Sequence, residues 1–137
     1  MEKRNKLIYI AAVFLFVALV SAYNFPLNKQ TIPSRFVVGE NMGFDLDPGK
    51  LNFGQIVPGY SASRQIMVDN TFDKPILVNI KSSGELSKYV IVSENNFVLE
   101  PSQSKNITFS AFADRSLDYG EYSGQIIITS KRNFFGL

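Results

Sequence analysis

Hydrophobic residues follow two different patterns along this chain. Between Leu7 and Tyr23 they form one run of seventeen residues without a charge. From Arg35 onward they recur in short runs, in which β-branched and aromatic side chains alternate with polar ones between turn residues. The first pattern predicts one apolar helix, and the second predicts short β-strands. We therefore expect an all-β domain that follows a hydrophobic N-terminal segment.

The apolar run has the flanks of a targeting segment. Three basic residues lie within positions 3–6, and the positive-inside rule keeps such a cluster in the cytoplasm, so everything after Tyr23 is expected on the outer side. A buried core helix does not account for this charge asymmetry. As a helix at ~1.5 Å per residue the run spans about 25 Å, slightly short of a bilayer core of ~30 Å. The small residues Val20-Ser21-Ala22 also suit a signal peptidase.

Two outcomes stay open for this segment. Residues 1–23 are either a retained anchor, which contacts the membrane through residues 7–23, or a signal peptide that is cleaved after Ala22 and releases a secreted protein. Residues 24–34 are polar with two prolines, a composition typical of an extended linker. We therefore expect a stalk at 24–34 and one folded domain at 35–137.

Turn residues divide the folded domain into short strands. Ile76–Lys81 and Asn106–Ala113 show the clearest alternation, with an apolar side chain at every second position. Further strands are expected at Arg35–Val38, Phe44–Leu46, Leu51–Gln55, Ser63–Asp69, Tyr89–Ser93, Phe97–Leu99 and Tyr122–Ser130. Seven or more short strands at this spacing predict a sandwich of two β-sheets.

Motifs in these strands resemble a known superfamily. A strand with Leu-x-Phe-Gly, a strand that ends in Asn before a Pro-containing turn, a Pro-x-x-Ser turn and a closing Gly-x-Tyr-x-Gly hairpin follow one another over about residues 44–130. The residues are Leu51, Phe53, Gly54, Asn70, Pro75, Pro101, Ser104, Gly120, Tyr122 and Gly124. This order resembles the immunoglobulin-like β-sandwiches of the major sperm protein and abnormal-spindle/hydin type, and the related modules of prokaryotic envelope proteins.

The resemblance implies an immunoglobulin-like sandwich of seven or more strands, preceded here by one N-terminal hydrophobic helix. Each motif is a general device of β-sandwiches, so the resemblance implies a fold and no activity. The eukaryotic members lie in the cytoplasm, whereas this chain has an export signal. The envelope modules are therefore the parallel that applies.

Charge and composition exclude several classes of function. The formal net charge is +2, and leaving Glu2 and the three basic residues at positions 3–6 out of the totals of twelve acidic and fourteen basic residues gives eleven of each. A neutral domain does not follow a phosphate backbone, so we expect no nucleic-acid partner. The chain has no Cys and no His, which excludes a Ser-His triad, a thiolate nucleophile and nitrogen or sulfur ligands for zinc. No cofactor is expected.

The remaining candidates for chemistry are carboxylates in turns. Asp114, Asp118 and Glu121 lie near one end of the expected sandwich, and two carboxylates suffice for a glycosidase. Isolated acids in hairpin turns are usually solvated turn formers, so we expect no enzyme. Asp45-x-Asp47-x-Gly49 alternates oxygen ligands as a calcium loop does, but it lacks the distal Glu of an EF-hand, and Pro48-Gly49 explains it as a turn. We expect no metal site.

Two surface features remain as candidate contacts. Residues 106–108 form an N-glycosylation sequon, and Asn106 faces outward if Ile107 points to the core. The C-terminal tail follows the last expected strand and has little room in a completed sandwich, so it docks either on its own domain or on a partner. Its candidate partner-binding residues are Phe134, Phe135 and Leu137.

Two classes of function remain. The first, which we favour, is a structural or assembly module: a membrane-tethered, extracytoplasmic domain that contacts another envelope or surface-filament protein through a sheet edge, a sheet face or the C-terminal tail. The second is a cleaved, secreted binding or chaperone-like protein that captures partner strands by β-augmentation. Retention of residues 1–23 separates the two classes.

Overall fold

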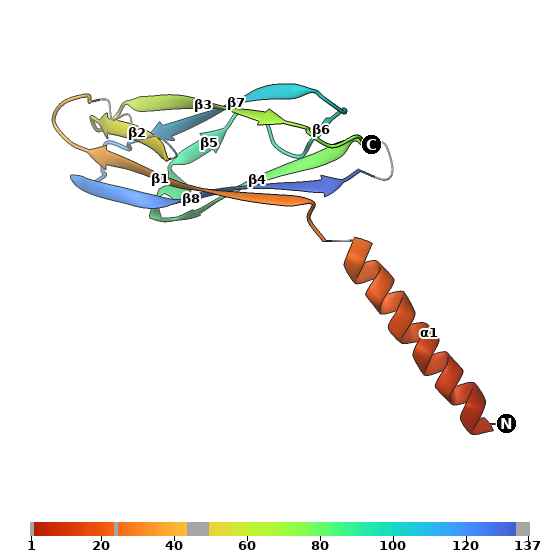
Figure 1. Ribbon diagram of the computed structural model, residues 1–137. Coiled ribbons are helices and arrows are strands. Elements are labelled where there is room, and N and C mark those ends of the chain that lie inside the picture. The colour runs from red at the N-terminus through yellow and green to blue at the C-terminus, as the bar shows by residue number, and fades with distance from the viewer. Residues whose placement is uncertain (1, 24, 44–49, 134–137) are drawn as a thin grey trace.

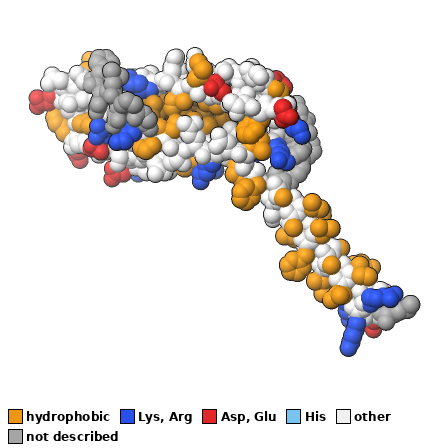
Figure 2. Space-filling view, in the orientation of Figure 1, with side chains coloured by type: hydrophobic (Ala, Val, Ile, Leu, Met, Phe, Trp, Pro, Cys, Tyr) orange, Lys and Arg blue, Asp and Glu red, His pale blue; other side chains and the backbone are white. Residues whose placement is uncertain are grey.

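Figure 1 shows the computed structural model, which describes residues 2–23, 25–43 and 50–133. α1 (Glu2–Tyr23) is the apolar helix that the sequence predicts. It is long and apolar enough to cross a membrane, and none of its apolar window is buried against the rest of the protein. In Figure 2 hydrophobic side chains surround the helix, and basic ones lie at its free end. Membrane anchors and signal sequences share these properties.

After α1 the described residues form eight strands and one short 3-10 helix. The elements are β1 (Asn28–Val38), β2 (Leu51–Ile56), β3 (Ser61–Asp69), β4 (Ile76–Gly84), η1 (Glu85–Lys88), β5 (Val90–Val92), β6 (Phe97–Leu99), β7 (Ser104–Phe112) and β8 (Gly120–Arg132). Sheet A contains five strands in the order β2-β1-β8-β4-β6, and sheet B contains three in the order β3-β7-β5. They form the two layers of Figure 1, which confirms the predicted domain of two β-sheets.

The core lies between the two sheets, and the alternation in the sequence predicts which side chains enter it. On β4 the buried residues are Ile76, Val78 and Ile80, and on β7 they are Ile107, Phe109 and Ala111. Phe36 on β1 and Phe53 on β2 are also buried. Because each large apolar side chain contributes about 1.5–3 kcal/mol when fully buried, and the chain has no Cys to form a disulfide, burial holds this domain together.

The folded domain begins earlier than the sequence analysis places it. β1 starts at Asn28, so the predicted stalk at 24–34 and the predicted domain boundary at residue 35 are both wrong. Residues 28–33 pair with residues 125–130 of β8, and this pairing with a distant strand outweighs a composition that is typical of a linker. The hydrogen bond from Gly39 N–H to Ile56 O of β2 shows that odd-numbered residues along β1 direct their backbone groups away from β8. Pro33 is therefore tolerated, because the ladder with β8 needs no N–H at this position.

Tyr122, from the closing Gly-x-Tyr-x-Gly motif, lies at the rim of the core. Its ring is half-buried and stacks on Phe36 with 5.1 Å between the ring centroids, and its hydroxyl donates to Asp118 O at 2.9 Å. A tyrosine at the rim of a core keeps its polar end hydrogen-bonded while its ring is packed. The strand expected at Phe44–Leu46 lies outside the described residues, and η1 has no counterpart in the sequence analysis.

Candidate functional site

The candidate contact surface is the open edge of β3. This strand pairs with β7 along all nine of its residues, from Ser61 opposite Phe112 to Asp69 opposite Ser104. It is the edge strand of sheet B, and no described strand lies on its other side. An edge strand presents backbone N–H and C=O groups that a strand of another chain can pair with.

Alternate residues of β3 direct their backbone groups to this open side. At the two ends of the ladder, Ala113 N–H donates to Tyr60 O and Asn70 N–H donates to Gln103 O. Even-numbered residues of β3 therefore bond to β7, and odd-numbered residues point their N–H and C=O groups outward. The side chains of the odd-numbered residues are exposed on the outer face of sheet B.

Arg64 covers the first half of this edge. Its side chain reaches toward sheet A, where Nε donates to Asn52 O at 3.1 Å and Nη2 donates to Phe53 O at 3.5 Å. Nη1 donates to Ser63 O of β3 itself at 2.8 Å, so one guanidinium satisfies carbonyls at the edges of both sheets. Inward-pointing charges on edge strands are a common protection against unwanted pairing. The sequence hint was an Arg in register with Ile66 and Val68, which the sequence analysis did not use.

The other sheet edges are short or protected. Gly43 pairs with Gln55 of β2 through two backbone hydrogen bonds, at 2.9 and 3.0 Å. β1 presents Pro33, which has no N–H, on its open side. β5 and β6 have only three residues each. Where β4 extends past its pairing with β6, the side chain of Asn95 bonds to both the N–H and the C=O of Ile80 at 2.7 Å.

Residues 65–69 of β3 are therefore an open edge with neither a proline nor a capping side chain, whereas β5 and β6 are short and β1 carries Pro33. The outer face of sheet B beside them has one charged side chain among its described strand positions, that of Asp69. It also exposes apolar groups: the exposed fractions are 61% for Met67, 69% for Ile91 and 44% for Phe112. A face with a single charged side chain and several exposed apolar ones suits contact with another protein.

Asn106 lies on this same face, opposite Met67 of β3. Asn106 is exposed and Ile107 is fully buried, so the predicted orientation of the sequon is confirmed. Attachment of a glycan to Asn106 stays a prediction. A glycan there would stand over the face of sheet B and leave the plane of the β3 edge open, because side chains project perpendicular to a sheet.

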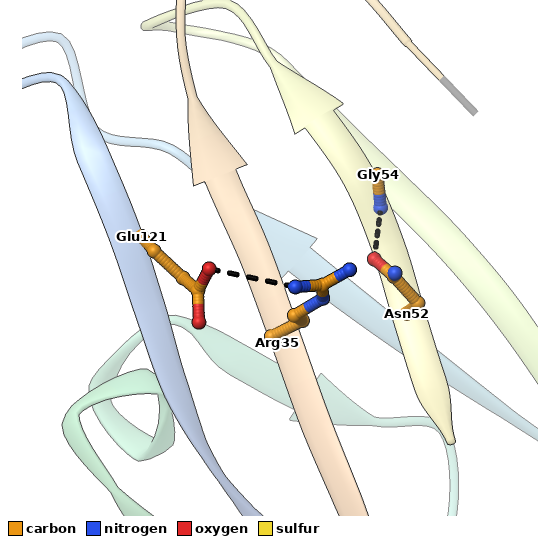
Figure 3. Close-up of polar contacts among 4 residues, drawn as sticks. All are labelled: Arg35, Asn52, Gly54 and Glu121. Atoms are coloured by element: carbon orange, nitrogen blue, oxygen red, sulfur yellow. Dashed lines mark hydrogen bonds and ion pairs between the residues drawn. The ribbon is translucent and has the colours of Figure 1, made fainter. Parts of the chain in front are cut away.

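A second polar feature lies on the outer face of sheet A, where β1, β2 and β8 are neighbours (Figure 3). Arg35 Nη1 and Glu121 Oε2 are 3.5 Å apart across β1 and β8. Next to them β2 bulges: Asn52 Oδ1 accepts the N–H of Gly54 at 3.0 Å, and the φ of 78° at Gly54 favours glycine. Arg35 and Glu121 line a shallow depression of about 220 Å³. The carboxylate of Glu121 in this depression is ion-paired with Arg35.

Replacing Glu121 with glutamine is expected to change the free energy of unfolding by less than about 0.5 kcal/mol. Both side chains of this ion pair are substantially exposed, at 39% for Arg35 and 54% for Glu121, and water screens such pairs. Urea denaturation of the E121Q variant measures the change. A loss above about 1 kcal/mol would assign the pair a structural role that this exposure does not support.

Two of the carboxylates predicted as chemical candidates, Asp114 and Glu121, make separate local contacts. Asp114 Oδ1 accepts the N–H and the hydroxyl of Ser116, both at 2.9 Å, and these bonds lower the pKa of Asp114. A lowered pKa suits an ionised turn former and not a general acid. Within the described ranges no three acidic side chains group closely enough to hold a metal ion.

Several predicted sites lie outside the described residues. They are the candidate calcium-loop residues Asp45 and Asp47 and the candidate partner-binding residues Phe134, Phe135 and Leu137. Comparison with models of protein families gave no match, and comparison with curated protein sequences gave none. The candidate surface therefore rests on the geometry of the sheets alone.

Proposed function

We propose that this protein is a membrane-tethered, extracytoplasmic, immunoglobulin-like module that contacts another envelope or surface-filament protein. The observation that carries the proposal is the edge of β3 at residues 65–69, which is open while the other described edges are short or protected. A protein that merely avoids association protects all of its edges. An open edge beside a face with a single charged side chain favours pairing with a partner strand.

The tether follows from α1 and its flanks. A helix of 22 residues, apolar over most of its length and with basic residues in its first two turns, suits a bilayer with the N-terminus in the cytoplasm. The domain then works on the outer side, as part of an assembly and without catalysis, because Asp114 is a turn former and Glu121 is ion-paired with Arg35. The competing function is a secreted protein that captures strands through the same edge after α1 is removed.

The mass of the mature protein from its native host separates these two functions. We expect a retained N-terminus, a domain that is cleaved by protease added from outside, and fractionation with membranes. A mature N-terminus at Tyr23 would contradict the tether and leave the secreted alternative. A domain that is shielded until the cytoplasmic membrane is opened would contradict the orientation.

Photocrosslinking in the same host tests the contact itself. A photoreactive amino acid placed at Gln65, on the β3 edge, is expected to form an adduct with one protein. Gln125 is the matched control, because it is an equally exposed glutamine on β8 in the middle of sheet A. Protein adducts from Gln125 alone, or from neither position, would overturn the assignment of the contact to β3.

A further inference from the structure

The outer face of sheet A carries a group of lysines in the half of the sheet nearer to α1. Lys29 on β1, Lys81 on β4 and Lys131 on β8 are all exposed. The strand register places the three lysines at successive outward-facing positions along β8. Lys81 lies beside Ile127, Lys29 lies beside Thr129, and Lys131 is the next outward-facing residue of β8 itself. Alternation along each strand directs all three side chains outward.

No acid balances these lysines within the described strands of sheet A. Glu121 is the acidic residue that those strands contain, and it lies opposite Val37, at the other end of β1, 3.5 Å from Arg35. The opposite layer differs: Lys105 on β7 is paired with Glu94 at 2.5 Å, and Arg64 bonds to backbone carbonyls. The described strands of sheet A therefore hold five basic side chains against one acidic one, whereas those of sheet B hold two basic side chains against one acidic one.

Lys29 also lies close to the membrane segment along the chain. α1 ends at Tyr23 and β1 begins at Asn28, so Lys29 is six residues from the end of the helix (Figure 1). Six extended residues span at most about 20 Å. A tether this short holds the lysine face at a high local concentration next to the bilayer surface.

We propose that the lysine face of sheet A docks on anionic phospholipid headgroups of the membrane that holds α1. Charge complementarity identifies this occupant, since the face is cationic and the tether keeps it within reach of the headgroups. Each basic residue near an anionic surface strengthens association about fivefold, so three lysines supply on the order of a hundredfold. Docking turns sheet B, and with it the β3 edge, away from the bilayer and toward a partner. This inference rests on the proposed retention of α1.

Fluorescence quenching in nanodiscs tests the docking on the full chain. The chain has no Cys, so a fluorophore on Q125C reports sheet A, and one on Q65C reports the opposite layer. With about a third of anionic phosphatidylglycerol and nitroxide quenchers on the headgroups, the label at position 125 is expected to be quenched several-fold more than the label at position 65. In phosphatidylcholine alone, or at high salt, the difference is expected to disappear because the attraction is electrostatic.

Two charge-matched triple variants give the controls. Replacing Lys29, Lys81 and Lys131 with glutamine is expected to abolish the difference between the labels. The same loss of three charges at Lys88 in η1, Lys105 on β7 and Arg115 after β7, which all lie outside the strands of sheet A, is expected to preserve it. Equal effects of the two triple variants would show that the attraction depends on net charge and not on the lysine face, and would overturn the proposal.

The remaining outcomes separate this inference from the proposed function. If the protein inserts into nanodiscs and the two labels are quenched equally in anionic lipid, lipid docking is wrong while the tether stands. Stronger quenching at position 65 would reverse the orientation and also overturn the inference. If the full chain does not insert at all, the tether and the docking that rests on it are both wrong.

Discussion

Replacing Asn70 with alanine is expected to lower the free energy of unfolding by about 3–5 kcal/mol. Asn70 is 1% exposed, and its side chain holds three backbone groups. Nδ2 donates to Lys74 O at 2.9 Å and to Leu99 O at 3.0 Å, and Oδ1 accepts the N–H of Phe72 at 2.9 Å. In the alanine variant these three backbone groups lose the hydrogen-bond partner that the Asn70 side chain supplies. Each backbone group that stays buried without a partner destabilises the folded state by about 1–3 kcal/mol.

Urea denaturation of the full chain in detergent micelles measures this loss. The matched control is Asn79→Ala, because Asn79 makes a side-chain bond of 2.6 Å to Asn96 in an exposed setting, and water replaces such a bond. We expect the control to lose less than about 1 kcal/mol. Equal losses in the two variants would show that Asn70 does not join the end of β3 to the following turn and β6.

A proline at position 65 is expected to weaken partner association at least tenfold while the domain stays folded. The N–H of Gln65 points to the open edge, so Gln65→Pro removes a donor from the partner and none from β7. Ile66→Pro removes a donor from the ladder with β7 and is expected to destabilise the domain by about 1–3 kcal/mol. Gln65→Ala keeps the N–H and is expected to retain binding.

Co-purification from native membranes and thermal melts together test this set of variants. The account requires that Gln65→Pro separates binding from stability and that Gln65→Ala changes neither. Loss of binding in Gln65→Ala to the same extent would assign the contact to the side chain, and hence to the face of sheet B. Unchanged binding in Gln65→Pro would remove β3 from the interface.

Local patterns in the sequence predict much of this fold. The alternation at Ile76, Val78 and Ile80 identifies a buried face within one strand, and the run after Leu7 identifies α1. The start of β1 at Asn28 is a different kind of fact. It depends on β8, about a hundred residues away, and composition near Pro33 gives no information about that pairing.

The candidate surfaces depend on the same long-range information. That β3 is an edge strand follows from the order of strands in sheet B, and its open backbone groups follow from its register with β7. The lysine face combines residues from β1, β4 and β8 that are separated by fifty residues or more along the chain. Neither the local sequence nor the neutral total charge of the domain therefore predicts it. Arg64 was the one local signal, as a charge on an otherwise apolar face.

Amide hydrogen exchange of β3, followed by NMR on the full chain with and without its partner, tests the central claim most directly. Without partner, the amides of Gln65 and Met67 are expected to exchange fast and those of Ile66 and Val68 slowly, because only the even-numbered residues bond to β7. In the complex, Gln65 and Met67 are expected to slow at least tenfold. Equal protection of all four amides without partner, or fast exchange of Gln65 and Met67 in the complex, would contradict pairing at the β3 edge.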